Sequence, residues 1–147
     1  MIFLLVIFVA IQFIRPARNI GTAESTTDIT HYVHTPDTVL RILQVSCYDC
    51  HSNHTDYPWY TNINPVGFWL RNHINEGKEA INFSDLSTLS KKKLDHSFGE
   101  IAETVEKEEM PLTSYTLMHS NAKLDIGQIQ MIKDWTNAAR KEIGYQE

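Results

Sequence analysis

Two cysteines and a histidine stand at a spacing that could bind a porphyrin. Cys47 and Cys50 are the only cysteines of the chain, and His51 follows directly. At this spacing two thiols can add across the two vinyl groups of one porphyrin, while a short helical turn directs the next imidazole toward the iron. The pattern is typical of c-type haem attachment. It predicts one covalent haem c per chain, with His51 as the proximal iron ligand.

Other chemistry could use the same residues. A zinc site could combine Cys47 and Cys50 with two of the nearby histidines, which are His51, His54 and His73. A CxxC redox pair normally opens a helix after a strand, and no strand-like run precedes Cys47. A structural disulfide suits a two-residue gap within a helical turn poorly. The adjacent His51 favours haem and leaves zinc as the main alternative.

Met110 is the expected sixth ligand of the iron. It stands at the end of a predicted helix, directly before Pro111, on an irregular segment free to loop over the porphyrin. A thioether is a soft, neutral ligand that favours ferrous iron and raises the reduction potential. The simpler explanation of Met110 is a side chain that fills a gap in the core. The rival sixth ligands are His73, His119 and Met118.

Aromatic side chains are expected to wall the macrocycle. Tyr57 and Trp59 flank Pro58 shortly after the haem motif, and Trp69 shares a helix face with His73. Such rings suit a flat apolar ligand and keep water from the iron. Ordinary core packing would bury the same rings. We therefore assign Tyr57, Trp59 and Trp69 to haem binding as an expectation.

Four helices are predicted to position these residues, because apolar side chains recur at three-and-four spacing between recognisable caps. Their expected ranges are 37–51, 64–77, 90–109 and 125–143. Gly77 and Gly144 are expected to close the second and the last helix as C′ glycines. In a small cytochrome the first and last helices pack against each other beside the haem.

The N-terminus predicts a membrane or export element. Residues 1–14 are apolar except for Gln12, and basic residues follow. The run has the length of a signal-peptide core and falls short of the about 20 apolar residues usual for a span. We expect 1–15 to be a membrane anchor or an uncleaved signal segment, 16–36 a polar linker, and 37–147 the haem domain. This predicts the inner membrane of a bacterium, with the haem domain facing the periplasm.

Length and charge set further limits. The 147 residues allow one domain with a short extension. The net charge of −5 argues against a nucleic-acid partner.

The chain resembles the haem-binding domain family, small membrane-tethered c-type haem proteins common in Bacteroidetes. The resemblance spans roughly residues 35–140 and includes the apolar leader. It is carried by Cys47 to Asn53, Tyr57-Pro58-Trp59-Tyr60, Pro65, Trp69, His73, Asn82-Phe83-Ser84, Met110-Pro111, Tyr115, His119, Ala122 and Leu124. The order of helix, haem motif, Met-Pro and final helix also resembles class I cytochromes c. The resemblance implies haem binding and an all-α fold, here a small cytochrome c-like domain behind an N-terminal apolar helix.

Three functions remain open. The first is a one-electron carrier with His51/Met110 ligation, which meets redox partner proteins through transient contacts. The second is a haem peroxidase or gas-ligand sensor with an open sixth site, for which His54, His73 or His119 are distal acid–base candidates. The third is a zinc-binding structural module. A single CxxCH and the absence of a distinct substrate domain favour the carrier.

Overall fold

The fold is built from helices alone in the part of the chain that the computed structural model describes, residues 1–23 and 25–145. These residues form seven α-helices and no β-strand, which confirms the predicted all-α class. The α-helices are α1 (Ile2–Ile11), α2 (Asp37–Ser46), α3 (Tyr48–His51), α4 (Val66–Ala80), α5 (Lys91–Glu106), α6 (Thr113–Thr116) and α7 (Ile126–Ile143). Short 3₁₀ turns lie at η1 (Ile29–His31), η2 (Trp59–Asn62) and η3 (Ser120–Ala122).

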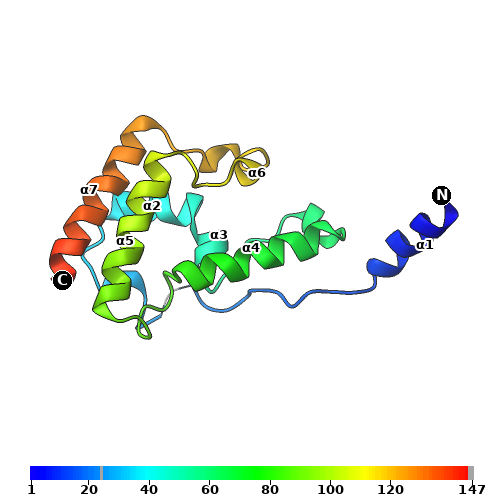
Figure 1. The fold of residues 1–147 in the computed structure, drawn as a ribbon, viewed down its shortest axis with the longest axis horizontal. Helices are drawn as coiled ribbons and strands as arrows, with labels where there is room; N and C mark the ends of the chain where they lie inside the picture. The colour runs from blue at the N-terminus through cyan, green and yellow to red at the C-terminus, as the bar shows by residue number, and fades with distance from the viewer. Residues whose placement is uncertain (24, 146–147) are drawn as a thin grey trace.

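The main core lies between α5 and α7, which pack side by side at one end of the molecule (Figure 1). Phe98 of α5 meets Trp135 of α7 edge to face, with ring centroids 5.2 Å apart, and both side chains are buried. Leu43 of α2 is fully buried in the same core, and α2 also contacts α7. The expected contact between the first and last helices of the domain is therefore present, although α5 covers more of α7.

Local caps set the ends of the two long C-terminal helices. The Ser90 hydroxyl accepts a hydrogen bond from the Lys93 N–H, as the predicted cap requires. Asp125 and Gln128 form a reciprocal capping box at the start of α7. Gly144 ends that helix in the left-handed region, with φ of 64°, where glycine carries no steric cost. The predicted starts at Ser90 and Asp125 and the stop at Gly144 are confirmed, whereas α5 ends at Glu106, before the predicted 109.

The predicted helix over 37–51 is wrong in one respect, because it breaks at Cys47. The backbone there has φ of −129° and ψ of −35°, which ends α2 and starts the separate turn α3. Cys50 and His51 therefore lie on α3, which packs against α4. Because of this break, the attachment motif faces α4. In a continuous helix the motif would extend along the axis of α2 instead.

The second predicted helix was expected to stop at Gly77, but α4 continues to Ala80. A Cβ atom at Gly77 would lie 2.8 Å from the Cys50 carbonyl oxygen. Gly77 thus lets α4 approach α3 closely, and it does not terminate the helix. The reason for this glycine is a contact with a distant segment, which local sequence does not reveal.

Part of the expected linker over 16–36 is built into the domain. Ile29 is fully buried and Val33 is 2% exposed, and both belong to the main core. The Asn19 side chain donates hydrogen bonds to the Ser52 carbonyl and the Thr55 hydroxyl, both at 2.9 Å. The described residues 16–23 and 25–36 therefore include contacts with the domain at Asn19, Ile29 and Val33, and we call them the N-terminal strap.

The N-terminal apolar helix forms as α1, and none of its ten residues is buried. No helix in residues 1–23 and 25–145 is long and apolar enough to cross a membrane, so the expected transmembrane helix is not found. The base of α1 is fixed to the domain by Asn64, which is 1% exposed. The Asn64 side-chain amide donates to the Ile11 and Ile14 carbonyls at 2.7 Å, and the Gln12 side chain pairs with the Asn64 backbone.

Candidate functional site

A cavity of about 250 Å³ lies beside the attachment motif. Its walls come from the end of α2, from α3, from the C-terminal half of α4 and from residues 110–115. The lining residues that sequence analysis assigned to iron or haem are Cys47, Cys50, His51, His73 and Met110. The break at Cys47 and the close approach at Gly77 bring these residues together from segments far apart in the chain.

His51 is oriented by the C-terminal end of α4. Its Nδ1 atom lies 3.2 Å from the Ile81 carbonyl oxygen, which only accepts, so Nδ1 carries the proton. The Nε2 atom then has the free lone pair that a metal ligand needs. Burial lowers the pKa of His51, although hydrogen bonds to the Ile81 and Gly77 carbonyls oppose this effect. Burial thus favours the neutral imidazole, the form that binds iron.

The two cysteines are free thiols and form no disulfide. Burial raises the pKa of the Cys47 thiol to about 12, with a smaller contribution from Cys50. Burial, followed by the nearby Asp49 carboxylate, raises the pKa of the Cys50 thiol to about 11. Redox and nucleophilic cysteines need the opposite shift, because the thiolate is their reactive form. The surroundings of Cys47 and Cys50 therefore argue against a thiol-disulfide redox pair.

Met110 enters the same cavity from the segment between α5 and α6. Its side chain is partly buried and packs against the main core, and its N–H donates to the Thr104 carbonyl at 3.2 Å. Pro111 and Leu112 continue the cavity wall beyond it. The thioether of Met110 thus shares a cavity with the imidazole of His51.

His73 also lines the cavity, and Trp69 contacts it. The His73 Nδ1 atom lies 3.0 Å from the Trp69 carbonyl oxygen, so its Nε2 atom is available as a ligand or base. The rings of Trp69 and His73 pack with centroids 4.3 Å apart. Trp69 itself is 47% exposed and does not line the cavity. Trp69 could therefore influence a ligand in the cavity only indirectly, by packing against His73.

The structure does not bring Tyr57 and Trp59 to the cavity. The Tyr57 hydroxyl accepts a hydrogen bond from the Asn19 N–H at 2.8 Å, and the Arg18 guanidinium lies over its ring. Trp59 is 73% exposed. Neither ring lines the cavity, so a role of Tyr57 and Trp59 in walling the porphyrin stays a prediction without support from the cavity lining.

Two of the rival sixth ligands also lie elsewhere. His119 Nε2 is 2.8 Å from the Tyr60 hydroxyl, and its ring stacks on Tyr115. Met118 is 60% exposed. Neither lines the cavity, which leaves Met110 and His73 as the candidates within reach of it.

Tyr115 is a cavity residue to which the sequence pattern assigned no role. Its hydroxyl donates a hydrogen bond to Asp49 Oδ2 at 2.7 Å, and Asp49 Oδ1 accepts from the Asp56 N–H. Burial first, and then the hydrogen bond to Asp49, raise the pKa of the Tyr115 phenol. Tyr115 was among the residues that carry the resemblance. Its hydrogen bond to Asp49, which lies between the two cysteines, joins residues 66 positions apart, so no local sequence pattern could have predicted it.

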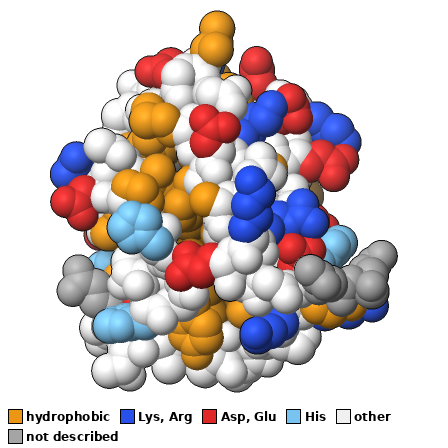
Figure 2. Space-filling view, turned by 90° about the vertical axis from the view of Figure 1, so that its left-hand side faces the viewer, with side chains coloured by type: hydrophobic (Ala, Val, Ile, Leu, Met, Phe, Trp, Pro, Cys, Tyr) orange, Lys and Arg blue, Asp and Glu red, His pale blue; other side chains and the backbone are white. Residues whose placement is uncertain are grey.

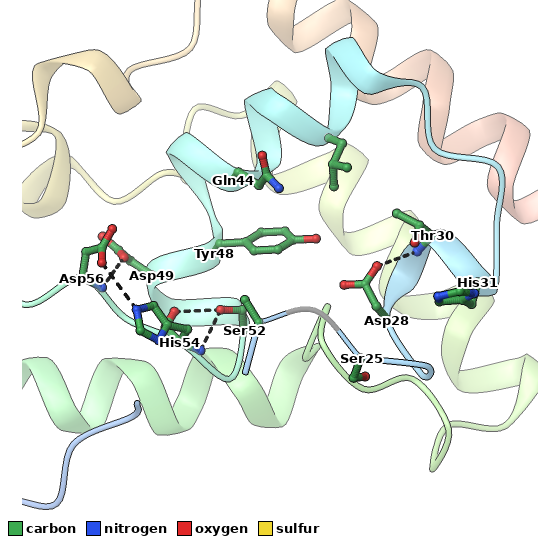
Figure 3. Close-up of a pocket in the computed structure, with 12 residues that line it drawn as sticks. Ser25, Asp28, Thr30, His31, Gln44, Tyr48, Asp49, Ser52, His54 and Asp56 are labelled. Carbon is green, nitrogen blue, oxygen red and sulfur yellow. Dashed lines mark hydrogen bonds and ion pairs between the residues drawn. The ribbon is translucent and has the colours of Figure 1, made fainter. Parts of the chain in front are cut away.

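A second cavity, of about 320 Å³, lies along Tyr48 and does not fit a haem (Figure 3). The Tyr48 ring points into it from α3, toward Asp28 of the N-terminal strap. Carboxylates of Asp28, Asp49 and Asp56 line it, and its described lining residues include neither cysteine nor methionine. The attachment motif thus lies between a cavity lined by thiol, thioether and imidazole groups and one lined by carboxylates, hydroxyls and the imidazoles of His31 and His54.

The zinc alternative has no preformed set of ligands. Within residues 1–23 and 25–145, no group of three or more His, Cys, Asp or Glu side chains is arranged to hold a metal ion. His54 instead binds the Gly21 carbonyl through Nδ1 at 3.1 Å and lies at the surface.

The donor set of the smaller cavity fits haem c. Two neutral thiols, one imidazole with a free Nε2 and one thioether line the same space. Its volume of about 250 Å³ lies below the ~300–1,000 Å³ of typical ligand pockets, so the cavity would enclose only part of a macrocycle.

Comparison with known proteins supports haem binding. The family model described as a haem-binding domain matches residues 6–138, from within α1 to within α7. Searches of curated proteins and of solved structures found no match.

Proposed function

Since this chain belongs to the haem-binding domain family, and is thus a haem-binding protein, we propose that it carries single electrons through one covalently attached haem c. The observation that supports this most directly is the cavity that contains Cys47, Cys50 and His51 together with Met110. A bound haem supplies a one-electron couple between ferric and ferrous iron.

Each residue of the motif has a separate role in this proposal. The Cys47 and Cys50 thiols would hold the haem by adding to its two vinyl groups, which consumes the thiol protons. His51 would bind the iron through Nε2, and the Ile81 carbonyl fixes the ring in the tautomer that leaves Nε2 free. All three side chains are partly buried, and burial favours the neutral form of each, which supports these roles.

Met110 is the better of the two candidate sixth ligands. His73 lies on α4, the helix that packs directly against α3 and its His51. Met110 comes from a separate segment, so it can reach the iron from a different wall of the cavity. A His51/Met110 pair would close the iron to outside ligands, as an electron carrier requires, and would raise the reduction potential relative to two histidines.

The proposal also includes a location and partners. We propose that α1 anchors the protein at the outer face of a bacterial inner membrane by burying apolar side chains without crossing the bilayer. A helix of ten residues is about 15 Å long, roughly half of the hydrocarbon core. A haem that is only partly enclosed would offer an edge to redox proteins in transient contacts.

One observation favours a second function. His73 has a free Nε2 in the cavity, where it could serve as an acid–base group beside an open sixth site. The protein would then be a haem peroxidase or a gas-ligand sensor, with Met110 as a core residue only.

Purification of the full chain from a host that attaches haem c separates these functions. For the carrier we expect a mass increase of one haem per chain that survives denaturation. We also expect low-spin spectra in both oxidation states and no spectral change when carbon monoxide is added to the ferrous protein. A high-spin ferrous protein that binds carbon monoxide would overturn the carrier and support the open site. A haem lost on denaturation would overturn covalent attachment.

The matched variants Cys47→Ser and Cys50→Ser test the attachment itself. Each should retain at most one covalent bond to the haem, and the double variant should lose the haem on denaturation. Ser120→Ala, at an exposed position in η3, serves as a control that keeps both thiols.

A further inference from the structure

An exposed apolar surface lies at the end of the domain that meets the C-terminal end of α1. We define the aromatic end surface as Trp59, Ile63, Val66 and Trp69, which are 73%, 41%, 37% and 47% exposed. They belong to η2, to the residues after it and to the first turns of α4. Val66 and Trp69 are three residues apart on one helix and therefore share a face.

The helix α1 projects from this same end of the molecule (Figure 1). Asn64, which lies between Ile63 and Val66 in sequence, binds the carbonyls of Ile11 and Ile14. The side chain of Gln12 pairs with both backbone groups of Asn64, at 2.9 Å each. These hydrogen bonds hold the C-terminal end of the exposed apolar helix at Asn64, whose neighbours Ile63 and Val66 belong to the aromatic end surface.

Basic side chains surround the junction. Arg15 donates to the Asn62 carbonyl at 2.8 Å, and Arg18 donates to the Asn62 side chain. Arg71 of α4 donates to the Ala17 carbonyl at 2.6 Å. Three guanidinium groups are thus fixed where α1 meets the domain, at the level that headgroups would occupy if α1 were inserted.

The opposite end of the molecule carries many charged side chains on its surface. Figure 2 shows acidic and basic side chains over that face, with hydrophobic side chains exposed between them. Apolar insertion into a bilayer is therefore suited to the α1 end.

We propose that the aromatic end surface docks the domain onto an anionic lipid bilayer when α1 is inserted. Tryptophan rings favour the level of the headgroups, and arginine side chains there attract anionic lipid. This inference rests on the membrane anchor of the proposed function and adds a second contact that orients the domain. Val66 and His73 are seven residues apart on α4, about 10 Å along its axis. The haem cavity would thus lie close to the bilayer surface.

Co-sedimentation of the full-length holoprotein with vesicles of phosphatidylcholine and phosphatidylglycerol tests this docking. The double variant Trp59→Ser/Ile63→Ser should lower the partition coefficient roughly tenfold, because two exposed apolar side chains no longer leave water. Ile126→Ser is the matched control, since Ile126 is 87% exposed at the start of α7, away from α1. The haem spectrum and the thermal midpoint of each variant verify that it is folded.

The outcomes separate the surface from the anchor. Weakened binding of the double variant with unchanged binding of Ile126→Ser supports the docking surface. Binding of the double variant within twofold of the original chain overturns the docking surface and leaves α1 as a simple anchor. Absence of binding by the original chain overturns both, while the covalent haem, measured by mass, stands independently of either result.

Discussion

The hydroxyl of Tyr115 donates a 2.7 Å hydrogen bond to Asp49 Oδ2 and so joins α6 to the turn between the two cysteines. Asp49 has a second partner, because its Oδ1 atom accepts from the Asp56 N–H at 2.9 Å. The carboxylate thus connects the attachment motif to two other segments. Since Met110, Pro111, Leu112 and Tyr115 line the cavity together, this hydrogen bond holds the Met110 segment against the motif.

Removal of that hydroxyl should loosen the cavity. Tyr115→Phe leaves the ring but removes a hydrogen bond to a charged group, so the free energy of unfolding should fall by about 1–2 kcal/mol. Urea unfolding of the holoprotein measures the change. Tyr32→Phe, at a phenol that is 38% exposed and far from the motif in sequence, should change it by less than about 0.5 kcal/mol. Equal losses in the two variants would contradict a specific role for Tyr115.

Alkaline pH should act on the same residue. The pKa of the Tyr115 phenol is raised by burial above its ordinary value of 10.0. The folded state therefore keeps the phenol proton that the unfolded state releases, so this stabilisation is complete below pH 10 and declines as the pH rises further. Unfolding measured on both sides of pH 10 should show a loss of stability that is smaller in Tyr115→Phe. The same pH dependence in both proteins would contradict this prediction.

Met110→Leu tests the sixth ligand with little change in side-chain volume. The variant should keep its covalent haem and lose less than about 1.5 kcal/mol of stability. It should also lose the weak long-wavelength absorption band of methionine-bound ferric haem, and its reduction potential should fall. Met118→Leu is the control, because Met118 is 60% exposed and outside the cavity. If Met110→Leu keeps the absorption band and the reduction potential, Met110 is not the sixth ligand and His73 becomes the candidate.

Two glycines in helix interiors should respond oppositely to alanine. Gly77→Ala places a Cβ atom 2.8 Å from the Cys50 carbonyl oxygen, so the expected loss of about 1–3 kcal/mol from overpacking exceeds the gain of about 1 kcal/mol in helix propensity. At Gly99 the nearest atom to such a Cβ is Arg140 Nη1, at an ordinary 3.5 Å. Gly99→Ala should therefore stabilise the protein. Thermal unfolding of both variants measures these changes. A higher midpoint for Gly77→Ala would contradict the close contact between Gly77 and Cys50 as the reason for this glycine.

Features with local causes could be predicted before the structure was known. The helix start at Ser90 and the stop at Gly144 depend on hydrogen bonds or backbone angles within a few residues. The haem motif is equally local, because Cys47, Cys50 and His51 follow one another within two turns of chain. The family match agrees with the prediction of a haem-binding domain from these residues.

Features that depend on distant contacts needed the tertiary structure. The role of Gly77 comes from Cys50, and the burial of Ile29 comes from a core built by later helices. The partners of Tyr115 and His51 lie 66 and 30 residues away in sequence. Periodicity records only which face of a segment is apolar, whereas packing decides which segments meet. Residue types and spacing therefore predicted a haem-binding protein, and only the folded chain decided which side chains surround the cavity beside the motif.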